Sequence, residues 1–478
     1  MTATTICKFF AISFLALSST LVAEKYNVLF IISDDLSSRA LGCYGNTQCK
    51  TPHIDKLATQ GIRFKTAYCQ YPVCGASRAS FMSGMYPHKI GILGNGQSGL
   101  FTKKMGSRYT LSENFHKQGY YAARVSKIYH MLIPGNITEG VSGPDHKASW
   151  NETFNFQGDE WFSKGEAEAI CRTSLNMDKD KHYGLGFGEA FYSVKVAGVD
   201  AKDQPDYKAA SKTMELIDKH GEQPFFLGVG LIRPHVPLVA PQEFFDMYSP
   251  EDMKLAEVIE DDLEDIPKSG IGKTAQKFGV VEKIRQQKAL AAYYASTSFM
   301  DAQFGRIMDH LEKKGLRDKT IVVFTSDHGW HLGEHSFWQK MNLHEEAAKV
   351  PLIISVPGQK PFVSNSLAEL IDLYPTLSDY CGLNIPQHVQ GKSLRPVISQ
   401  QVKEVRDAAF CVLRKDCCLL RTKNWALMQY GDKGERGSEL YDMVKDPKQY
   451  TNLAGKPEYG TALKTMQEKL QLKLKTAK

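Results

Sequence analysis

The sequence predicts an α/β protein: a large, mixed but mostly parallel sheet sandwiched by helices, followed by a small C-terminal domain with an antiparallel sheet. Continuous apolar runs of strand length occupy Tyr26–Ser33, Pro224–Leu231 and Thr320–Ser326. A strand that is apolar along its whole length belongs to a sheet covered on both faces, which favours parallel pairing. A long helical pattern over Gln286–Lys313 supplies part of that cover.

The remaining elements fill two domains. From about residue 400 the pattern changes to short strands that follow one another closely. We therefore expect a large catalytic domain over residues 24–400, with a loop-rich insertion at 131–205, and a small α+β subdomain over 401–478. Further helices are expected at Leu111–Gln118, Ala209–His220 and Thr461–Lys475, and further strands at Tyr120–Ser126, Leu352–Val356, Ala408–Leu413, Cys418–Thr422, Ala426–Tyr430 and Glu439–Asp442.

Residues 1–23 read as a signal peptide. Lys8 is their only charge, the apolar run Phe9–Leu17 follows, and Ala23 is a small residue at the expected cleavage point. This run is too short to span a membrane, so we expect a secreted or periplasmic protein without a membrane span in the mature chain. The net charge of +6 comes without any Lys/Arg run, which argues against a nucleic-acid partner and suits an anionic substrate.

The chain has ten cysteines. Without Cys7 in the signal peptide and Cys74, eight remain, an even number for an oxidising compartment. Spacing alone does not decide their pairing, and buried free thiols are the alternative. The pairs that are close enough in sequence are Cys43 with Cys49, and Cys411 with Cys417 or Cys418.

Polar residues follow the apolar strands at the points where the strands end. Asp34 and Asp35 follow the first run, His235 follows the second, and Asp327 and His328 follow the third. Open α/β sheets bind ligands at the carboxyl ends of their strands. Adjacent carboxylates repel one another, so they need a cation or must face water. The simpler interpretations are a solvated turn for the paired acids and a core or loop histidine.

Cys74 is followed four residues later by Arg78, with small residues between them. A thiol near a cation can be a nucleophile of lowered pKa. Ala79–Met82 looks like the first turn of a helix, which places Cys74 near a helix N-terminus, a natural anion site. Seen alone, Cys74 reads more simply as a buried structural cysteine, and Lys127 and His130 after the next strand read as surface residues.

Five short motifs together resemble the type I sulfatase family. Cys74–Arg78, followed by Met82-Ser83-Gly84, fits the family signature Cys-x-(Pro or Ala)-Ser-Arg, with Ala76 where the commonest form has Pro. The chain is most similar to the iduronate-2-sulfatase-like branch, and the resemblance covers roughly Asn27 to Asn452. The other matching motifs are the strand ending in Asp34-Asp35, Lys127-Ile128-Tyr129-His130, Pro234-His235-Val236-Pro237, and Ser326-Asp327-His328-Gly329 with Trp330 and Leu332–His335.

The resemblance implies the alkaline-phosphatase-like sulfatase fold and a site built around residue 74. It also implies that Leu367–Gly382 is the helix that closes the large domain. In that family a maturation enzyme oxidises the cysteine to formylglycine, whose aldehyde hydrate attacks sulfate esters. An imidazole ligand leaves manganese or magnesium open, but the resemblance favours one Ca²⁺ ion. The implied metal ligands are Asp34, Asp35, Asp327, His328 and residue 74. The implied catalytic roles are Arg78 and Lys127 orienting the hydrate, Lys127 and Lys340 binding the sulfate, His130 as base, and His235 protonating the leaving oxygen.

The same branch implies a sulfated carbohydrate as substrate, such as a 2-O-sulfated uronic acid or another sulfated polysaccharide unit. His331 and Trp338 are expected to face a carboxylated sugar. Two other functions stay open: a phosphatase or phosphodiesterase of the same superfold, and a glycan-binding protein without activity in which Ala76 blocks maturation. His331 and His335 also have the spacing of a helical zinc pair, although Gly333 between them favours a loop.

Overall fold

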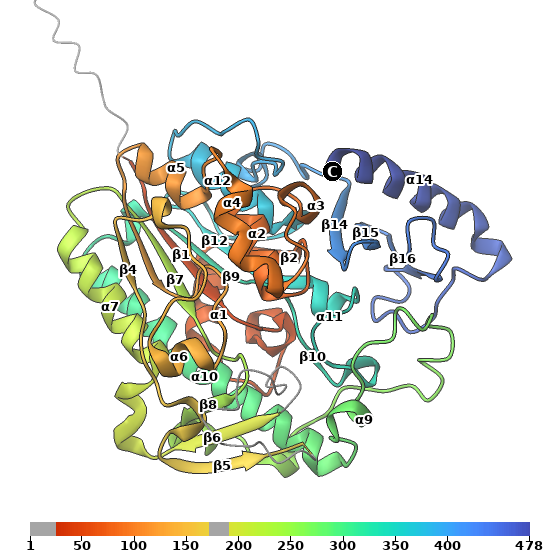
Figure 1. Ribbon diagram of the computed structural model, residues 1–478, viewed down its shortest axis with the longest axis horizontal. Helices are drawn as coiled ribbons and strands as arrows, with labels where there is room; N and C mark the ends of the chain where they lie inside the picture. Colours follow the sequence, from red (N-terminus) through yellow and green to blue (C-terminus); the bar gives the residue numbers. More distant parts are fainter. Residues whose placement is uncertain (1–24, 172–190) are drawn as a thin grey trace, which may run out of the picture.

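The computed structural model describes residues 25–171 and 191–478, so the expected signal peptide lies outside the described residues. An eight-stranded sheet runs through the molecule in the order β13-β2-β12-β9-β1-β7-β3-β4 (Figure 1). Its strands are β1 (Asn27–Ser33), β2 (Ile62–Tyr68), β3 (Tyr121–Ser126), β4 (Glu152–Phe154), β7 (Phe225–Leu231), β9 (Thr320–Ser326), β12 (Lys349–Ser355) and β13 (Phe362–Glu369).

The centre of the sheet is parallel. β1 pairs with β9 on one side and with β7 on the other, and β7 pairs in parallel with β3. β12 runs antiparallel to both β9 and β2, which makes the sheet mixed. Every residue of β1, β7 and β9 is buried, as their apolar sequences predict. The carboxyl ends of β9, β1, β7 and β3 therefore lie next to one another along one edge.

Helices cover both faces of this sheet (Figure 1). Because side chains alternate along a strand, Phe30 of β1 packs on one face against Phe81, with ring centroids 6.1 Å apart, while Leu29 and Ile31 belong to the core of the other face. The first face carries α2 (Cys74–Ser83), α5 (Leu111–Lys117) and α12 (Leu373–Tyr380). The second carries α1 (Pro52–Gln60), α7 (Pro205–His220) and α10 (Lys283–Lys313).

The insertion expected to be loop-rich contributes strands as well as loops. β4 extends the main sheet, and β5 (Gly165–Ala169) and β6 (Tyr192–Val196) join β8 (Leu238–Pro241) in a three-stranded sheet. The shorter helices are α3 (Pro87–Ile90), α4 (Phe101–Met105), α6 (Gly135–Glu139), α8 (Gln242–Phe245), α9 (Ala275–Phe278), α11 (Glu345–Ala348) and α13 (Arg395–Ile398).

The C-terminal part forms a four-stranded antiparallel sheet, β14 (Ala408–Leu413), β15 (Cys417–Thr422), β16 (Trp425–Tyr430) and β17 (Ser438–Asp442), followed by α14 (Gly460–Ala477). Its buried side chains continue the core of the first face. Arg406, buried before β14, forms ion pairs with Glu369, the last residue of β13, and with Asp372. The predicted fold class is confirmed. None of the helices within the described ranges is long and apolar enough to cross a membrane.

Two expected helix positions are wrong. α2 begins at Cys74, five residues before the expected first turn at Ala79, so Cys74 is the first helical residue. The segment expected as one helix over Leu367–Gly382 starts inside β13, because Leu367 and Glu369 pair in parallel with β2. A short apolar run fits both a strand and a helix, and tertiary pairing decides between them.

The cysteines that the structure describes do not form the disulfides that the sequence left open. All nine cysteines in the described ranges are free. Cys411 lies opposite Leu419 in the β14–β15 ladder, so Cys411 and Cys418 point to opposite faces. Cys417 is two residues further along, a diagonal of about 7–8 Å that a disulfide cannot span. Cys49 instead donates from Sγ to a backbone carbonyl of α10 at 3.9 Å.

Candidate active site

Side chains from the carboxyl ends of β9, β1, β7 and β3 meet the N-terminus of α2 in one buried cluster. The structure brings together the ten residues that the sequence motifs single out as catalytic or metal-binding. Apart from Lys340, which is partly buried, each is at most 8% exposed. They are Asp34, Asp35, Cys74, Arg78, Lys127, His130, His235, Asp327, His328 and Lys340.

The Arg78 guanidinium is the centre of this cluster. Its Nη2 donates to Asp34 Oδ1 and its Nε donates to Asp327 Oδ2, both at 2.9 Å. Its Nη1 donates to the backbone oxygen of Lys127 at 2.5 Å. Because Arg78 is wholly buried, these bonds offset the cost of removing its charge from water. One side chain thus joins the ends of β1, β9 and β3.

Two lysines neutralise the paired aspartates. Lys127 Nζ lies 2.5 Å from Asp34 Oδ2, and Lys340 Nζ lies 2.6 Å from Asp35 Oδ1. Burial opposes the ionisation of Asp34, but Lys127 and the neighbouring guanidinium outweigh it and hold the pKa of Asp34 well below its usual range. His235 and Lys340 likewise outweigh burial and lower the pKa of Asp35. Both carboxylates are therefore ionised near neutral pH.

The Cys74 thiol points into the cluster from the first residue of α2. Its Sγ lies 3.1 Å from Lys340 Nζ, 3.2 Å from His328 Nε2 and 3.6 Å from Asp35 Oδ1. The amide of the next residue, Gly75, donates to Asn95 Oδ1 at 2.8 Å, which holds the start of the helix in place. A helix N-terminus favours negative charge, so the start of α2 can bind an anion at position 74. Asp35 and His328, on the other side of the sulfur, are groups that bind a cation.

His328 is oriented by its own loop. Its Nδ1 lies 2.9 Å from the Gly329 carbonyl oxygen, which can only accept, so Nδ1 carries a proton and Nε2 faces the cluster. Asp327 and Cys74 outweigh burial and raise the pKa of His328 well above its usual value. A proton on Nε2 therefore competes with a metal ion for the same position.

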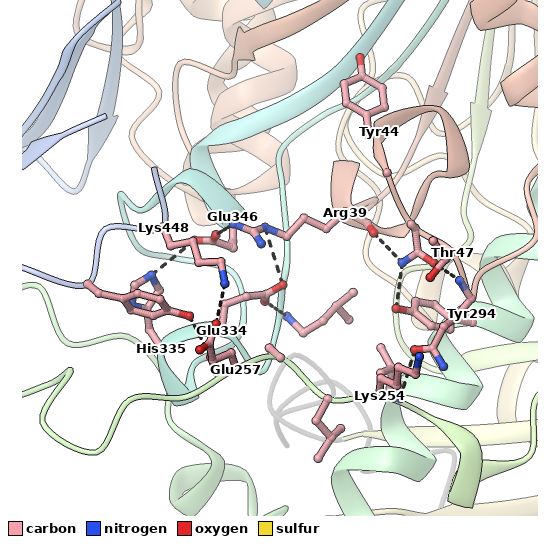
Figure 2. Close-up of a pocket in the computed structure, with 18 residues that line it drawn as sticks. Arg39, Tyr44, Thr47, Lys254, Glu257, Tyr294, Glu334, His335, Glu346 and Lys448 are labelled. Atoms are coloured by element: carbon pink, nitrogen blue, oxygen red, sulfur yellow. Dashed lines mark hydrogen bonds and ion pairs between the residues drawn. The ribbon is translucent and has the colours of Figure 1, made fainter. Parts of the chain in front are cut away.

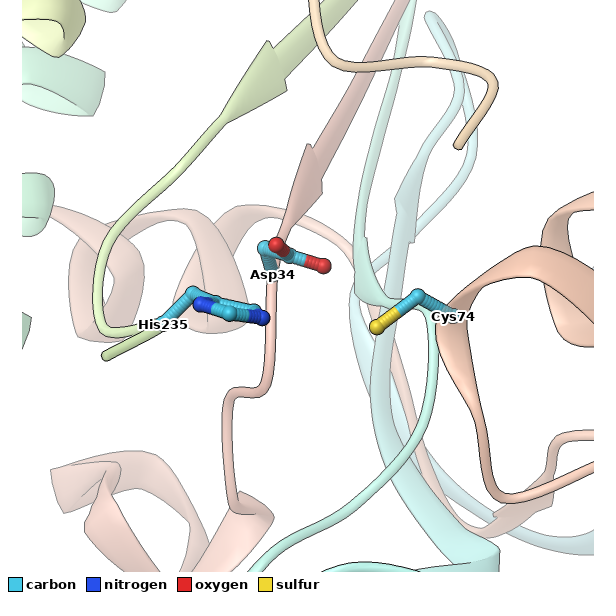
Figure 3. Close-up of side chains that lie close together, drawn as sticks. All are labelled: Asp34, Cys74 and His235. Carbon is cyan, nitrogen blue, oxygen red and sulfur yellow. The ribbon is translucent and has the colours of Figure 1, made fainter. Parts of the chain in front are cut away.

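The ring of His235, like that of His328, is oriented by the backbone carbonyl of the residue that follows it. Its Nδ1 donates to the Val236 carbonyl oxygen at 2.6 Å, and its Nε2 lies 3.6 Å from Asp35 Oδ2. Burial lowers the pKa of His235 to about 4, so the ring is neutral near neutral pH. Figure 3 shows the imidazole of His235 and the carboxylate of Asp34 directed toward the sulfur of Cys74.

His130 lies at the edge of the cluster. Neither of its ring nitrogens has a hydrogen-bond partner within the described part of the chain, although it is only 7% exposed. Burial and the charge of Lys127 hold the pKa of His130 well below its usual value, which keeps it neutral, as a general base must be. Together with Arg78, Tyr129 and Asp145 it lines a cavity of about 10 Å³, the size of one water molecule.

The carboxylates can hold a metal ion. One oxygen each of Asp34, Asp35 and Asp327 lie within 4.8 Å of one another, all buried. Asp35 Oδ2 is buried and has no hydrogen-bond partner among the described residues, which leaves it available as a ligand atom. Three carboxylates with one imidazole suit a hard divalent cation, for which carboxylate oxygen is the preferred ligand.

The loop after β9 encloses the two predicted sugar contacts. His331 is 0% exposed, with Nε2 2.9 Å from Asn342 Oδ1, and Trp338 is 1% exposed and packs against Phe191. His331 starts the short strand β10 (His331–Leu332), and His335 lies in a 3-10 turn with φ 56°. The two histidines therefore do not share a helix, and the helical zinc pair is wrong. The role of His331 and Trp338 as sugar contacts stays a prediction.

A separate polar cavity of about 340 Å³ lies beside this loop (Figure 2). Arg39 forms an ion pair with Glu346 there and approaches Glu334 at 3.8 Å. Its lining includes Tyr44 and Lys448 but none of the ten residues gathered around position 74. The cavity is therefore distinct from the buried cluster around Cys74.

Two supporting residues were missed by the sequence reasoning. The Tyr293 hydroxyl donates to the Asp35 carbonyl oxygen at 2.7 Å and accepts from the Ser37 amide at 2.8 Å. The Ser77 hydroxyl donates to the Asp327 carbonyl oxygen at 2.5 Å. Ser77 lies inside the signature motif, so its position was a usable signal. Tyr293 fits the helical apolar spacing of α10, and nothing in that pattern marks its hydroxyl.

Comparison with known proteins decides the family. The profile described as "Sulfatase" matches residues 26–383. The chain belongs to the sulfatase family. A second profile, described as "N-sulphoglucosamine sulphohydrolase, C-terminal", matches residues 333–476 of the sulfatase. The resemblance drawn from the motifs is thereby confirmed, and the protein is a sulfuric ester hydrolase.

Individual relatives agree with this assignment. The sulfatase is 32% identical to human iduronate 2-sulfatase over 407 residues, which cover 76% of this chain and 70% of the human one. It is 29% identical to a sulfatase of Formosa agariphila over 93% of this chain and 86% of that one. A solved structure of the phosphonate monoester hydrolase of Silicibacter pomeroyi has the same fold, with a TM-score of 0.73 at 22% identity, over 95% of this chain and 96% of that one.

Proposed function

We propose that this sulfatase is an exported enzyme that hydrolyses a sulfate ester of a carbohydrate, through a formylglycine formed from Cys74 and with one Ca²⁺ ion. The observation that carries the proposal is the position of Cys74 Sγ, 3.2 Å from His328 Nε2 and 3.1 Å from Lys340 Nζ. A nucleophile at position 74 lies between His328, a residue type that can bind a metal ion, and Lys340, whose positive charge can bind the sulfate. The signal-peptide pattern of residues 1–23 supports export.

The residues present fit calcium. Asp34, Asp35, Asp327, His328 and residue 74 would hold the ion. Asp35 Oδ2, which has no hydrogen bond within the described part of the chain, supports this set. When bound, the ion would supply a Lewis acid that polarises a sulfate oxygen and lowers the pKa of the attacking hydroxyl.

The other side chains have roles that follow from their surroundings. A formylglycine hydrate would supply one hydroxyl for attack on sulfur and a second whose deprotonation releases sulfate. Lys127 and Lys340 would bind the sulfate oxygens, where buried cations stabilise developing charge. His130, neutral and unpartnered, can take the proton. His235 must first gain a proton on Nε2, which a bound anionic ester would favour, before that nitrogen can donate to the leaving oxygen.

The substrate class is supported by relatives. The human protein is named for iduronate 2-sulfate, and the second matching profile is named for a sulphoglucosamine hydrolase. We therefore place a 2-O-sulfated uronic acid first and other sulfated polysaccharide units second. A panel of sulfated di- and oligosaccharides, with free sulfate as the readout, ranks them directly.

Phosphoryl chemistry is the second candidate, because phosphonate monoester hydrolases share this fold. Cys74 and the pair of Lys127 and His130 favour the sulfatase instead, since phosphatases of this superfold use Ser or Thr with two zinc ions. Comparing turnover of an aryl sulfate, an aryl phosphate and an aryl phosphonate separates the two. Preference for a phosphorus ester would reverse the assignment.

Mass spectrometry of the tryptic peptide 66–78 tests the nucleophile, and this peptide carries its own control. It contains Cys69 as well as Cys74. Protein made together with a formylglycine-forming maturation enzyme should alkylate at Cys69 only, and Cys74→Ala should abolish desulfation while Cys69→Ser keeps it. A fully active protein whose peptide 66–78 keeps both thiols intact would end the formylglycine mechanism.

A further inference from the structure

The site of the translated chain contains a set of zinc-type ligands. Cys74 Sγ, His328 Nε2 and Asp35 Oδ1 form a triangle with sides of 3.2 Å (Sγ to Nε2), 3.1 Å (Nε2 to Oδ1) and 3.6 Å (Sγ to Oδ1). Tetrahedral zinc bonds of about 2.3 Å to sulfur and about 2.0–2.2 Å to nitrogen and oxygen separate such ligands by about 3.3–3.6 Å. The three atoms thus already lie at nearly the spacing of one face of a zinc coordination sphere.

The surroundings also prepare these atoms to bind a metal. The Gly329 carbonyl oxygen accepts from His328 Nδ1, which turns Nε2 toward the sulfur, as outer-shell partners of zinc-bound histidines do. His235 is held in the same way, and one ligand atom each of Asp34, Cys74 and His235 lie within 4.8 Å of one another (Figure 3). The fourth position can therefore be filled from the chain or by water.

We propose that the chain with an unmodified Cys74 binds one Zn²⁺ ion through Cys74, His328 and Asp35, and that oxidation of Cys74 changes the preferred metal of the site to calcium. On binding, the S–H bond of Cys74 and the Nε2–H bond of His328 break, S–Zn and N–Zn bonds form, and both protons leave to solvent. A thiolate with an imidazole selects zinc, whereas calcium takes oxygen ligands. In the maturation step a two-electron oxidant such as dioxygen oxidises the Cβ of residue 74: the C–S bond breaks, the sulfur leaves as hydrogen sulfide, and a C=O bond forms. The ligand set that remains is rich in oxygen. Only the calcium half rests on the proposed function; zinc binding requires no turnover.

The Lys340 ammonium must move away before zinc can bind. Its Nζ lies 3.1 Å from Cys74 Sγ and 2.6 Å from Asp35 Oδ1, where a zinc ion would repel it. Its side chain is 11% exposed while that of Asp35 is 0% exposed, so the ammonium can move toward solvent. Lys340→Met in the unmodified chain should therefore bind zinc more tightly than the parent.

The test uses the full chain made without the maturation enzyme, with two thiols verified in peptide 66–78. After the chain is stripped of metal, Zn²⁺ is titrated against a chromophoric chelator in excess Ca²⁺. One zinc per chain is expected. Cys74→Ser and His328→Asn should weaken zinc binding by at least about tenfold. Cys69→Ser, which removes a buried thiol bonded to the Ala347 carbonyl oxygen instead, should leave the affinity unchanged.

Cobalt gives a readout that needs no variant. Co²⁺ in the unmodified chain should show a sulfur-to-cobalt charge-transfer absorption in the near ultraviolet, and the matured protein should lack it. Zinc that fails to bind, Cys74→Ser that binds zinc as tightly as the parent, or bound cobalt without the charge-transfer absorption would overturn the proposal. Sulfatase activity of the matured protein is measured separately, so loss of one proposal is distinguishable from loss of the other.

Discussion

The Nε atom of Arg78 lies 2.9 Å from Oδ2 of Asp327, and both side chains are wholly buried. The same guanidinium reaches Asp34 Oδ1, also at 2.9 Å. A planar guanidinium fixes the distance between the groups that it bridges, which a flexible ammonium cannot do. Arg78 therefore sets the spacing between the ends of β1 and β9, and with it the spacing of the proposed metal ligands.

Arg78→Lys tests this bridge. Lysine can reach only one of the two carboxylates, so either Asp34 or Asp327 loses its bond to residue 78. Breaking a buried ion pair costs about 3–5 kcal/mol. We expect the free energy of unfolding to fall by that amount and kcat/KM to fall by at least roughly 100-fold, because misplaced groups lose proximity. Thermal unfolding and aryl sulfate turnover measure both. Arg436→Lys, at a surface pair with Asp416, is the control and should change little.

Calcium removal should destabilise the matured protein. Asp34, Asp35 and Asp327 are buried close together, so their repulsion grows when no cation lies between them. A chelator should abolish turnover and lower the unfolding temperature, and calcium at about 100 times its Kd should restore about 2.7 kcal/mol of stability. Asp35→Asn should lose most of this calcium effect. Restoration by magnesium but not by calcium would assign a different ion.

His235→Gln separates proton donation from sulfate positioning. If His235 protonates the leaving oxygen, the variant should lose roughly 10²–10⁴-fold in kcat on a sugar sulfate, the usual contribution of a general acid. An aryl sulfate with an acidic phenol needs no such proton and should lose much less. Equal losses on both substrates would show that His235 acts on the sulfate group instead, as its approach to Asp35 Oδ2 at 3.6 Å allows.

The strand ends were predictable because physical signals coincide there. β1 and β9 are apolar throughout, and ionisable residues that follow such strands must face a ligand or a partner. The start of α2 was less visible, because Gly75 and Ser77 are weak helix formers. Contacts far apart in sequence fix it: the amide of Gly75 bonds to Asn95, and the Ser77 hydroxyl bonds to the Asp327 carbonyl. Such contacts leave no periodic pattern.

Asp301 links stability to pH outside the buried cluster around Cys74. Its carboxyl accepts from the amides of His53 and Ile54 at the start of α1, at 3.2 and 2.8 Å, yet burial outweighs these bonds and raises its pKa to about 7. Between its ordinary value of 3.8 and about 7, the folded chain holds a proton that the unfolded chain has lost. Stability should therefore fall by roughly 4 kcal/mol as pH rises across this window and then level off.

Asp301→Asn should remove this slope, because the amide does not titrate. Chemical unfolding of the parent and the variant at a series of pH values measures it, with Asp309→Asn, at an exposed position of the same helix α10, as the matched control. The variant should be less stable than the parent at low pH, since an amide nitrogen cannot accept one of the two N–H bonds. It should gain relative to the parent as pH rises. A parallel pH dependence in the parent and Asp301→Asn would show that Asp301 is ionised in the folded protein.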